Sequence, residues 1–423
     1  MTAAQRANAQ GFLGWRMVSV AFLVDFIAVG FFFYSFGVFY PAIDAELEGS
    51  SLLVAAGISV SSAVSGFFAP FIGRALDRYP LKPCMLLGAV VVSAGFLCLS
   101  RIQSYWQYYL VLGSFFAFGL SLMGGMASSK LVANWFILKR GTALGVATMG
   151  VSLSGLLMPT LATWLVSEVG WRGGFAVYAA GILVIVLPLV AFFVVTRPED
   201  VGQHPDGGSA EEAALRNATP EVYWRTRDVL RARNFWCIAL AFAAVFSSLS
   251  AILIHIIPYA GDLGITGYRA GWVLSISAGA GVLGKLVFGR LIDRWDPRLV
   301  VLSSFLTQIV GLLLLMRDAG YSGLLLAAVV FGLGMGGVVP LQGALCGLVF
   351  GRLSFGEVMG LMRPVQVPLH ALGIPLAAWI HDTTGSFELA FQIFVGVYVA
   401  SCLMVWLLQL PASPRSAREP GIA

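Results

Sequence analysis

Hydrophobic residues dominate the chain in long runs, and short polar turns separate one run from the next. Each run is about 20 residues long, enough for an α-helix to cross about 30 Å of hydrocarbon. The pattern therefore predicts an all-α membrane protein with twelve transmembrane helices. The predicted spans are 15–41, 51–73, 83–101, 105–131, 140–165, 173–196, 235–258, 269–289, 299–316, 321–350, 357–380 and 387–410.

The longest polar stretch lies between the sixth and seventh spans, at about 197–234. It combines acidic residues, arginines and the pair Gly207-Gly208, a composition typical of a surface linker with one short helix. The stretch divides the chain into an N-terminal six-helix bundle at 1–196, a cytoplasmic linker at 197–234 and a C-terminal six-helix bundle at 235–423.

One six-residue phrase occurs in both halves. Residues 73–78 read Gly-Arg-Ala-Leu-Asp-Arg, and residues 289–294, which begin 216 positions later, read Gly-Arg-Leu-Ile-Asp-Arg. Gly124-Gly125 in span four correspond in the same way to Gly336-Gly337 in span ten. Matched positions in two halves indicate parallel pseudo-repeats, the organisation of the major facilitator fold.

The repeated phrase is also a candidate gate. Its glycine permits two helices to approach closely. Its aspartate either pairs with arginines or faces the positive N-terminal end of a neighbouring helix. Such contacts, broken and re-formed, would open and close one side of the protein. The predicted gating residues are Gly73, Asp77, Arg78, Gly289, Asp293 and Arg294.

Composition excludes several classes of protein. Of the 423 residues, 58% are hydrophobic and 11% are charged, against about 25% charged in soluble domains. The five cysteines are scattered without a CxxC pattern, which favours helix packing over disulfides or metal ligation. No catalytic, nucleotide-binding or metal-binding motif appears, so we predict neither an enzyme nor a cofactor. The net charge of +5 is assigned to loops, not to nucleic-acid binding.

The distribution of basic residues predicts the orientation. With the N-terminus placed inside, the cytoplasmic segments hold 19 of the 26 Lys and Arg residues, and the outer loops hold four. Under the positive-inside rule this bias places both termini in the cytoplasm. We therefore expect a multi-pass integral protein of the plasma (inner) membrane.

Several short motifs resemble one transporter branch. Residues 134–145 read Asn-Trp-Phe-Ile-Leu-Lys-Arg-Gly-Thr-Ala-Leu-Gly, and Gly150 and Ser154-Gly155 follow. This signature of spans four and five resembles that of the monocarboxylate transporters and the related oxalate:formate exchangers, within the major facilitator superfamily. Residues 14–18 and 382–387 are similar to members of the same branch. The resemblance implies a small carboxylate as substrate.

Ionisable residues inside the spans are candidates for function, because each costs several kcal/mol unless it faces a partner or water. Lys285 in span eight and Arg363 in span eleven lie at similar depths and together suit a carboxylate. In the resembled family an arginine stands four residues before the glycine of the repeated phrase, and Lys285 occupies that position before Gly289. Alternatively, Lys285 snorkels toward the membrane surface or is paired internally, and Arg363 snorkels toward the cytoplasmic surface.

His370 and Gln366 share a helical stripe with Arg363, because they follow it by seven and three residues. We predict that this stripe binds substrate, and that His370 either carries a proton or bonds structurally to a neighbouring helix. Asp25 near the middle of span one is either a proton-binding carboxylate or a buried partner of Lys130 or another polar group.

These observations predict a secondary active transporter of small organic anions. The preferred interpretation is a proton-coupled monocarboxylate symporter for substrates like lactate or pyruvate, working by alternating access as a monomer in the bilayer. In it, Lys285, Arg363, His370 and Gln366 bind substrate, and Asp25 or His370 carries the proton. An anion exchanger is the main alternative. An efflux transporter and a transporter-like nutrient sensor are less favoured.

Overall fold

The computed structural model describes residues 11–47, 51–209, 223–265, 268–317 and 320–410, and every regular element in these ranges is helical. The first predicted span is formed by α2 (Gly14–Val29), η1 (Gly30–Tyr34) and α3 (Ser35–Leu47). The next five are formed by α4 (Ser51–Arg78), α5 (Leu81–Leu99), α6 (Tyr105–Val111), η2 (Leu112–Phe116), α7 (Ala117–Met123), α8 (Met126–Trp135), α9 (Arg140–Gly181), η3 (Ile182–Val186) and α10 (Leu187–Phe193).

The linker contains the short turns η4 (Pro198–Val201) and η5 (Pro205–Gly207) and the six-residue helix α12 (Thr226–Arg231). The second half follows as α13 (Arg233–Asp262), α14 (Tyr268–Ile292), α15 (Pro297–Leu315), α16 (Gly320–Phe350), α17 (Phe355–Thr384) and α18 (Glu388–Trp406). These helices follow the predicted apolar runs, and most boundaries lie within a few residues of the prediction.

Ten stretches in the described part of the chain are long and apolar enough to cross a membrane. One of them, Arg140–Phe193, holds two of the predicted spans, because Gly170 leaves the helical conformation at φ +70°. Helix α17 is absent from the ten, although it has 30 residues. It contains three prolines and Arg363, and polar groups at membrane depth require protein or water around them. With α17 and the division at Gly170, all twelve predicted spans are present.

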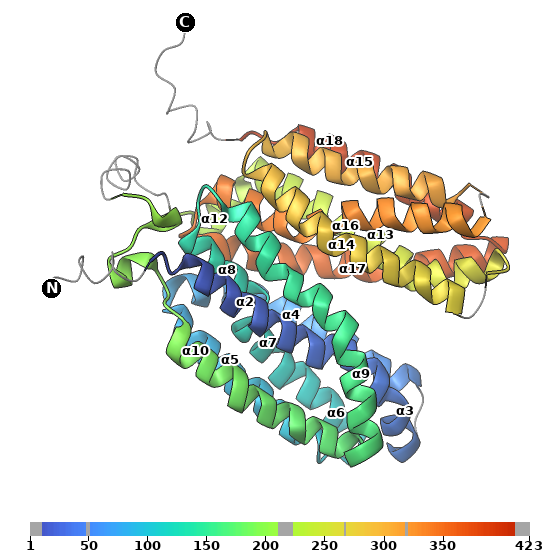
Figure 1. Ribbon diagram of the computed structural model, residues 1–423, viewed down its shortest axis with the longest axis horizontal. Helices are drawn as coiled ribbons and strands as arrows, with labels where there is room; N and C mark the ends of the chain where they lie inside the picture. The colour runs from blue at the N-terminus through green and yellow to red at the C-terminus, as the bar shows by residue number, and fades with distance from the viewer. Residues whose placement is uncertain (1–10, 48–50, 210–222, 266–267, 318–319, 411–423) are drawn as a thin grey trace, which may run out of the picture.

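The helices form two bundles, each around its own apolar core. The first core consists of buried residues between Met17 and Val194, and the second consists mainly of residues between Val229 and Leu408. In Figure 1 the bundles lie closest together near α8 and α12 and diverge toward α3. We call the end at which α8, α12 and the linker lie the linker face. The exact division of the chain at 196 and 235 stays a prediction.

The repeated phrase joins the bundles at the linker face. Asp77 of α4 accepts hydrogen bonds from the backbone N–H groups of Gly356 (2.9 Å) and Glu357 (2.7 Å) at the start of α17. In the same way Asp293 accepts from Gly141 and Thr142, both at 2.7 Å, where α9 begins. Each aspartate therefore faces the N-terminus of a helix in the other bundle, one of the two arrangements considered from the sequence.

Glycines allow these contacts. A Cβ atom added to Gly73 would collide with the backbone of Gly356, whereas one added to Gly37 of α3 would meet no atom within 4 Å. We therefore expect Gly73→Ala to destabilise the protein by about 1–3 kcal/mol through overpacking, and Gly37→Ala to leave it unchanged. Thermal unfolding of the two variants in detergent is the measurement. Equal Tm values would show that the helices tolerate a wider separation.

Candidate functional site

Helix α17 presents the predicted stripe on one side. Around the helix axis Arg363 lies about 60° from Gly360 and about 60° from Gln366. Gly360 packs against Ala69 of α4, and on the other flank Gly373 packs against Ser247 of α13. Arg363 therefore faces the space between the two bundles instead of the surrounding lipid.

Arg363 is an exposed residue whose guanidinium is unpaired in the described chain. The residue is exposed although it lies within a membrane-spanning helix that packs on both bundles. It has no hydrogen-bond or ion-pair partner among the residues that the structure describes. A cation in this position needs water or an anion beside it.

Gln366 and His370 extend the stripe. Gln366 is only 5% exposed, and its side-chain Nε2 has no hydrogen-bond partner among the described residues. His370 Nε2 lies 2.6 Å from Ser250 Oγ of α13, and its ring lies parallel to that of Phe246, with the ring centroids 6.4 Å apart. His370 is nevertheless exposed and close enough to Arg363 for their charges to interact. Both interpretations of His370, as a proton carrier and as a structural group, therefore stay open.

Lys285 does not contact Arg363 in this structure. Its Nζ donates to the backbone oxygen of Thr148 (3.0 Å) and to Ser152 Oγ (2.5 Å), both on α9 of the other bundle. The residue is 7% exposed. The expected pairing of Lys285 and Arg363 around one carboxylate therefore stays a prediction, and it requires Lys285 to leave its present partners. The sequence did contain an indication of these partners of Lys285, because Thr148 and Ser152 are polar residues one turn apart in an apolar span.

Asp25 of α2 lies at a break in span four. Its Oδ1 accepts a hydrogen bond from Gly125 N–H (2.8 Å), between α7 and α8, and it interacts electrostatically with Lys285. The expected alternative of a pair between Asp25 and Lys130 is not formed. Lys130 Nζ instead lies 2.5 Å from Asp77 Oδ1, and it also donates to the backbone oxygen of Arg352 in the second bundle.

The linker face holds charged contacts that the sequence did not indicate. Glu357, which is buried, accepts hydrogen bonds from Tyr223 (2.8 Å) and Thr226 of the linker, and it pairs with Arg74 at 3.3 Å. Another ion pair, at 2.6 Å, connects Arg352 with Glu199 of the linker. The sequence did contain one indication of these contacts, because Glu357 is a carboxylate at the start of an apolar run. The motif arginines Arg78 and Arg294 are exposed on this face.

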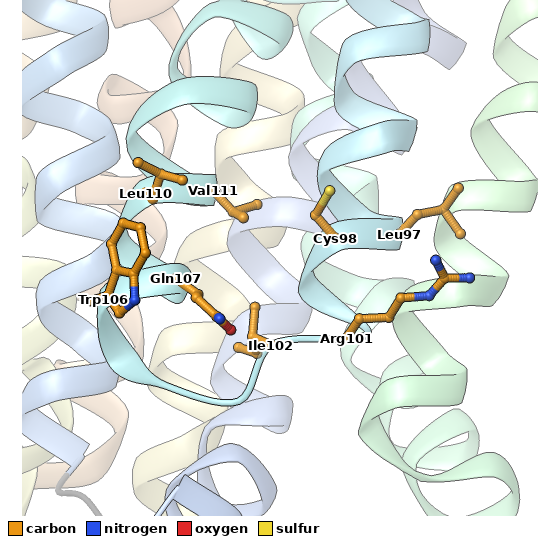
Figure 2. Close-up of a pocket in the computed structure, with 8 residues that line it drawn as sticks. All are labelled: Leu97, Cys98, Arg101, Ile102, Trp106, Gln107, Leu110 and Val111. Atoms are coloured by element: carbon orange, nitrogen blue, oxygen red, sulfur yellow. The ribbon is translucent and has the colours of Figure 1, made fainter.

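A crevice of about 320 Å³ lies elsewhere on the molecule (Figure 2). It is formed where α5 ends and α6 begins, in the first bundle, away from the linker face. Its lining contains none of the candidate side chains. The residues that line it are Leu97, Cys98, Arg101, Ile102, Trp106, Gln107, Leu110 and Val111.

The arrangement on α17 is chemically suited to an anion. A guanidinium, an amide N–H₂ group and an imidazole lie within two turns, and a carboxylate accepts hydrogen bonds from all three. Across the residues that the structure describes, His, Cys, Asp and Glu do not gather in groups of three or more that would hold a metal ion.

Comparisons with known proteins identify similar chains. A family model described as Major Facilitator Superfamily matches residues 22–363 and 250–423. The chain is 29% identical to monocarboxylate transporter 11 of Homo sapiens, over 93% of this chain and 82% of that protein. It is 26% identical to monocarboxylate transporter 13 of Bos taurus, over 90% of this chain and 85% of that protein. The crystal structure of the human organic anion transporter MFSD10 has the same fold, with a TM-score of 0.71 and 17% identity over 93% of this chain and 99% of that one.

Proposed function

The chain belongs to the Major Facilitator Superfamily, and we propose that it is a secondary active transporter of small organic anions. The family match makes it a multi-pass membrane transporter and not an enzyme. The observation that supports an anionic substrate is Arg363, an exposed arginine inside a membrane-spanning helix whose guanidinium has no partner in the described chain. Two similar proteins named as monocarboxylate transporters support a carboxylate.

The charges inside the spans favour Arg363 as the first substrate contact. Lys130 pairs with Asp77, and Lys285 donates two hydrogen bonds to α9. Arg363 alone of these three cations is left for an external anion. A substrate carboxylate on Arg363 would reach the donors of Gln366 and His370, and Lys285 would join it on leaving Ser152.

The proposed orientation assigns the structure to one state of the transport cycle. The basic residues favour a cytoplasmic linker face with both termini on that side of a plasma membrane. In the described chain, the hydrogen bonds between the two bundles begin at the linker face and extend into the membrane only as far as Lys285. The structure then corresponds to a transporter closed toward the cytoplasm, and alternating access requires these contacts to break. Function as a monomer remains part of the proposal.

Coupling to protons is the preferred energy source. Asp25 or His370 would bind the proton, and the added positive charge would favour the substrate anion in the same transporter, because each offsets the charge of the other. Anion exchange uses the same stripe without net proton movement. The two modes differ in their response to a pH gradient.

Uptake into proteoliposomes tests this proposal. We expect lactate or pyruvate to accumulate when the outside is more acidic than the inside, because the inward proton gradient drives a symporter. A screen of radiolabelled lactate, pyruvate, formate and oxalate, with and without the gradient, measures both substrate class and coupling.

Two other outcomes of the uptake screen would change or contradict the proposal. Uptake that is accelerated by internal counter-substrate and not by the pH gradient would establish exchange in place of symport. Absence of transport for every carboxylate, in vesicles whose protein is shown to be folded, would contradict the anion proposal.

A further inference from the structure

We propose that Asp25 controls the linker-face gate through α8, a ten-residue half-helix with the carboxylate at one end and the gate lysine Lys130 in its middle. In this mechanism, protonation of Asp25 loosens α8 and so weakens the contact that Lys130 makes between the bundles. The proposal deepens the proton coupling suggested above and rests on it, but it concerns a conformational change that can be measured without any substrate.

The break in span four is built around Asp25. Gly125 adopts φ +50° and ψ −88°, a conformation that L-residues with a side chain avoid, and α8 begins at the next residue. A Cβ atom added to Gly124 would lie 3.0 Å from Asp25 Oδ1, so the lack of a side chain there lets the carboxylate approach. Broken helices expose N–H groups that lipid cannot satisfy. Asp25 supplies the acceptor.

The second half of the chain serves as an internal comparison. Gly336-Gly337 correspond to the glycine pair of span four, yet α16 runs without a break from Gly320 to Phe350. The stretch of α13 that corresponds to Asp25 contains the apolar residues 241–243 and offers no carboxylate. The glycine pair by itself therefore does not break the helix. The helix break therefore occurs in the half of the chain that has a buried carboxylate, Asp25, beside the glycine pair.

Helix α8 connects this carboxylate to the gate. Lys130 lies four residues, or about 6 Å, beyond the first residue of α8. Its Nζ contacts Asp77 of the repeated phrase and the backbone oxygen of Arg352 in the other bundle. The far end of α8 is fixed, because Trp135 Nε1 donates to Val195 O at 3.0 Å. A release at the Asp25 end would therefore turn α8 about its fixed end and displace Lys130.

Protonation changes the bond at that end. A carboxylate accepts a charge-assisted hydrogen bond from Gly125 and is attracted to the positive N-terminus of α8, whereas a carboxylic acid retains only a neutral hydrogen bond. Lys285 of the second bundle, whose Nζ donates to Thr148 and Ser152, is close enough to Asp25 for their charges to interact. Lys130 on α8 points to Asp77, and the buried Ser128 on the same helix lies beside the Asp25 carboxylate, where its hydroxyl is a second donor for the charged form.

Distance measurements between spin labels test the proposal in nanodiscs without substrate. Tyr79 and Trp295 follow the two copies of the repeated phrase on opposite bundles, and they are 57% and 66% exposed. Labels on cysteines at these positions, with the five native cysteines replaced, report the opening of the linker face. When the pH is lowered from about 8 to about 5, we expect the ratio of molecules with an open linker face to molecules with a closed one to rise by about tenfold. This rise is below the maximum for a single proton, which is about tenfold per pH unit.

Three variants and one control variant separate this route from others. Asp25→Asn keeps an acceptor for Gly125 but carries no charge, so its ratio should match that of the acidic wild type and change less than about twofold with pH. Lys130→Met keeps Asp25 but removes the connection, so its gate should open at both pH values without pH dependence. Gly125→Ala and Gly170→Ala both place a side chain at a positive φ with no atom within 4 Å, so both strain the backbone. Gly125→Ala does so at the break and should shift the ratio at every pH, whereas Gly170→Ala, outside α8, should keep the wild-type ratio.

Two results would overturn the proposal. One is a wild-type distance distribution that is the same at both pH values, and the other is full pH dependence retained in Lys130→Met. If Asp25→Asn fails to fold, the Lys130→Met and Gly125→Ala arms still decide the question. A pH-dependent gate in a protein that transports no carboxylate would support this inference while contradicting the proposed function.

Discussion

Arg363→Gln is expected to lower carboxylate uptake at limiting substrate by about 10- to 100-fold, because a charge-assisted bond to a buried anion contributes about 1.5–3 kcal/mol. The variant keeps a polar side chain, although a shorter one, and removes the charge and the paired N–H donors. Since Arg363 has no protein partner in the described chain, its removal breaks no hydrogen bond or ion pair of the structure, and the fold should be unaffected. Initial rates in proteoliposomes at several substrate concentrations are the measurement.

Two control variants make this result specific. Arg101→Gln removes an exposed guanidinium in the crevice of Figure 2, away from the stripe on α17, and should transport as wild type. Arg363→Lys keeps the charge but not the two-pronged geometry, so an intermediate loss is expected. Normal uptake by Arg363→Gln at low substrate would remove the residue from the binding site.

Asp77→Asn is expected to open the linker face and to slow transport by more than about tenfold, and its effect should exceed that of Asp293→Asn. Both aspartates accept two backbone N–H groups from the opposite bundle. Asp77 also neutralises the buried Lys130. Breaking a buried pair leaves an uncompensated charge and costs about 3–5 kcal/mol, whereas Asp293 has no ion-pair partner in the described ranges. The spin-label pair at Tyr79 and Trp295, together with uptake rates, measures both variants.

The double variant Asp77→Asn/Lys130→Met provides the control. Because it removes both members of the pair, no unpaired charge is left, and its linker face should close more fully than that of Asp77→Asn alone. Equal effects of Asp77→Asn and Asp293→Asn would mean that the helix N-termini, and not Lys130, dominate closure of this face.

Periodicity and composition were sufficient for the fold. Apolar runs of membrane length can form only helices in lipid, because every backbone group must be satisfied within the segment. The repeated phrase at 73–78 and 289–294 then indicated two related halves. Span eleven was also predicted correctly, although α17 contains Arg363 and three prolines, because its flanking residues remain apolar.

The candidate site could be predicted in part. The stripe of Arg363, Gln366 and His370 follows from helical geometry alone, since residues three and seven apart share a face. The partners of Lys285 could not be predicted, because Thr148 and Ser152 belong to the other bundle and lie more than 130 residues away. The break at Gly125 was also missed, since a glycine pair in a membrane helix usually indicates packing.

The sequence by itself determined which elements form and which charges enter the membrane, because both depend on local hydrophobicity and on helical period. The tertiary structure decided which of these charges are satisfied by the protein. Lys130, Lys285 and Arg363 are equivalent as cations in apolar runs, but the packing of two bundles gives partners to the first two and leaves Arg363 open. That difference depends on contacts between distant segments, which no local pattern in the sequence contains.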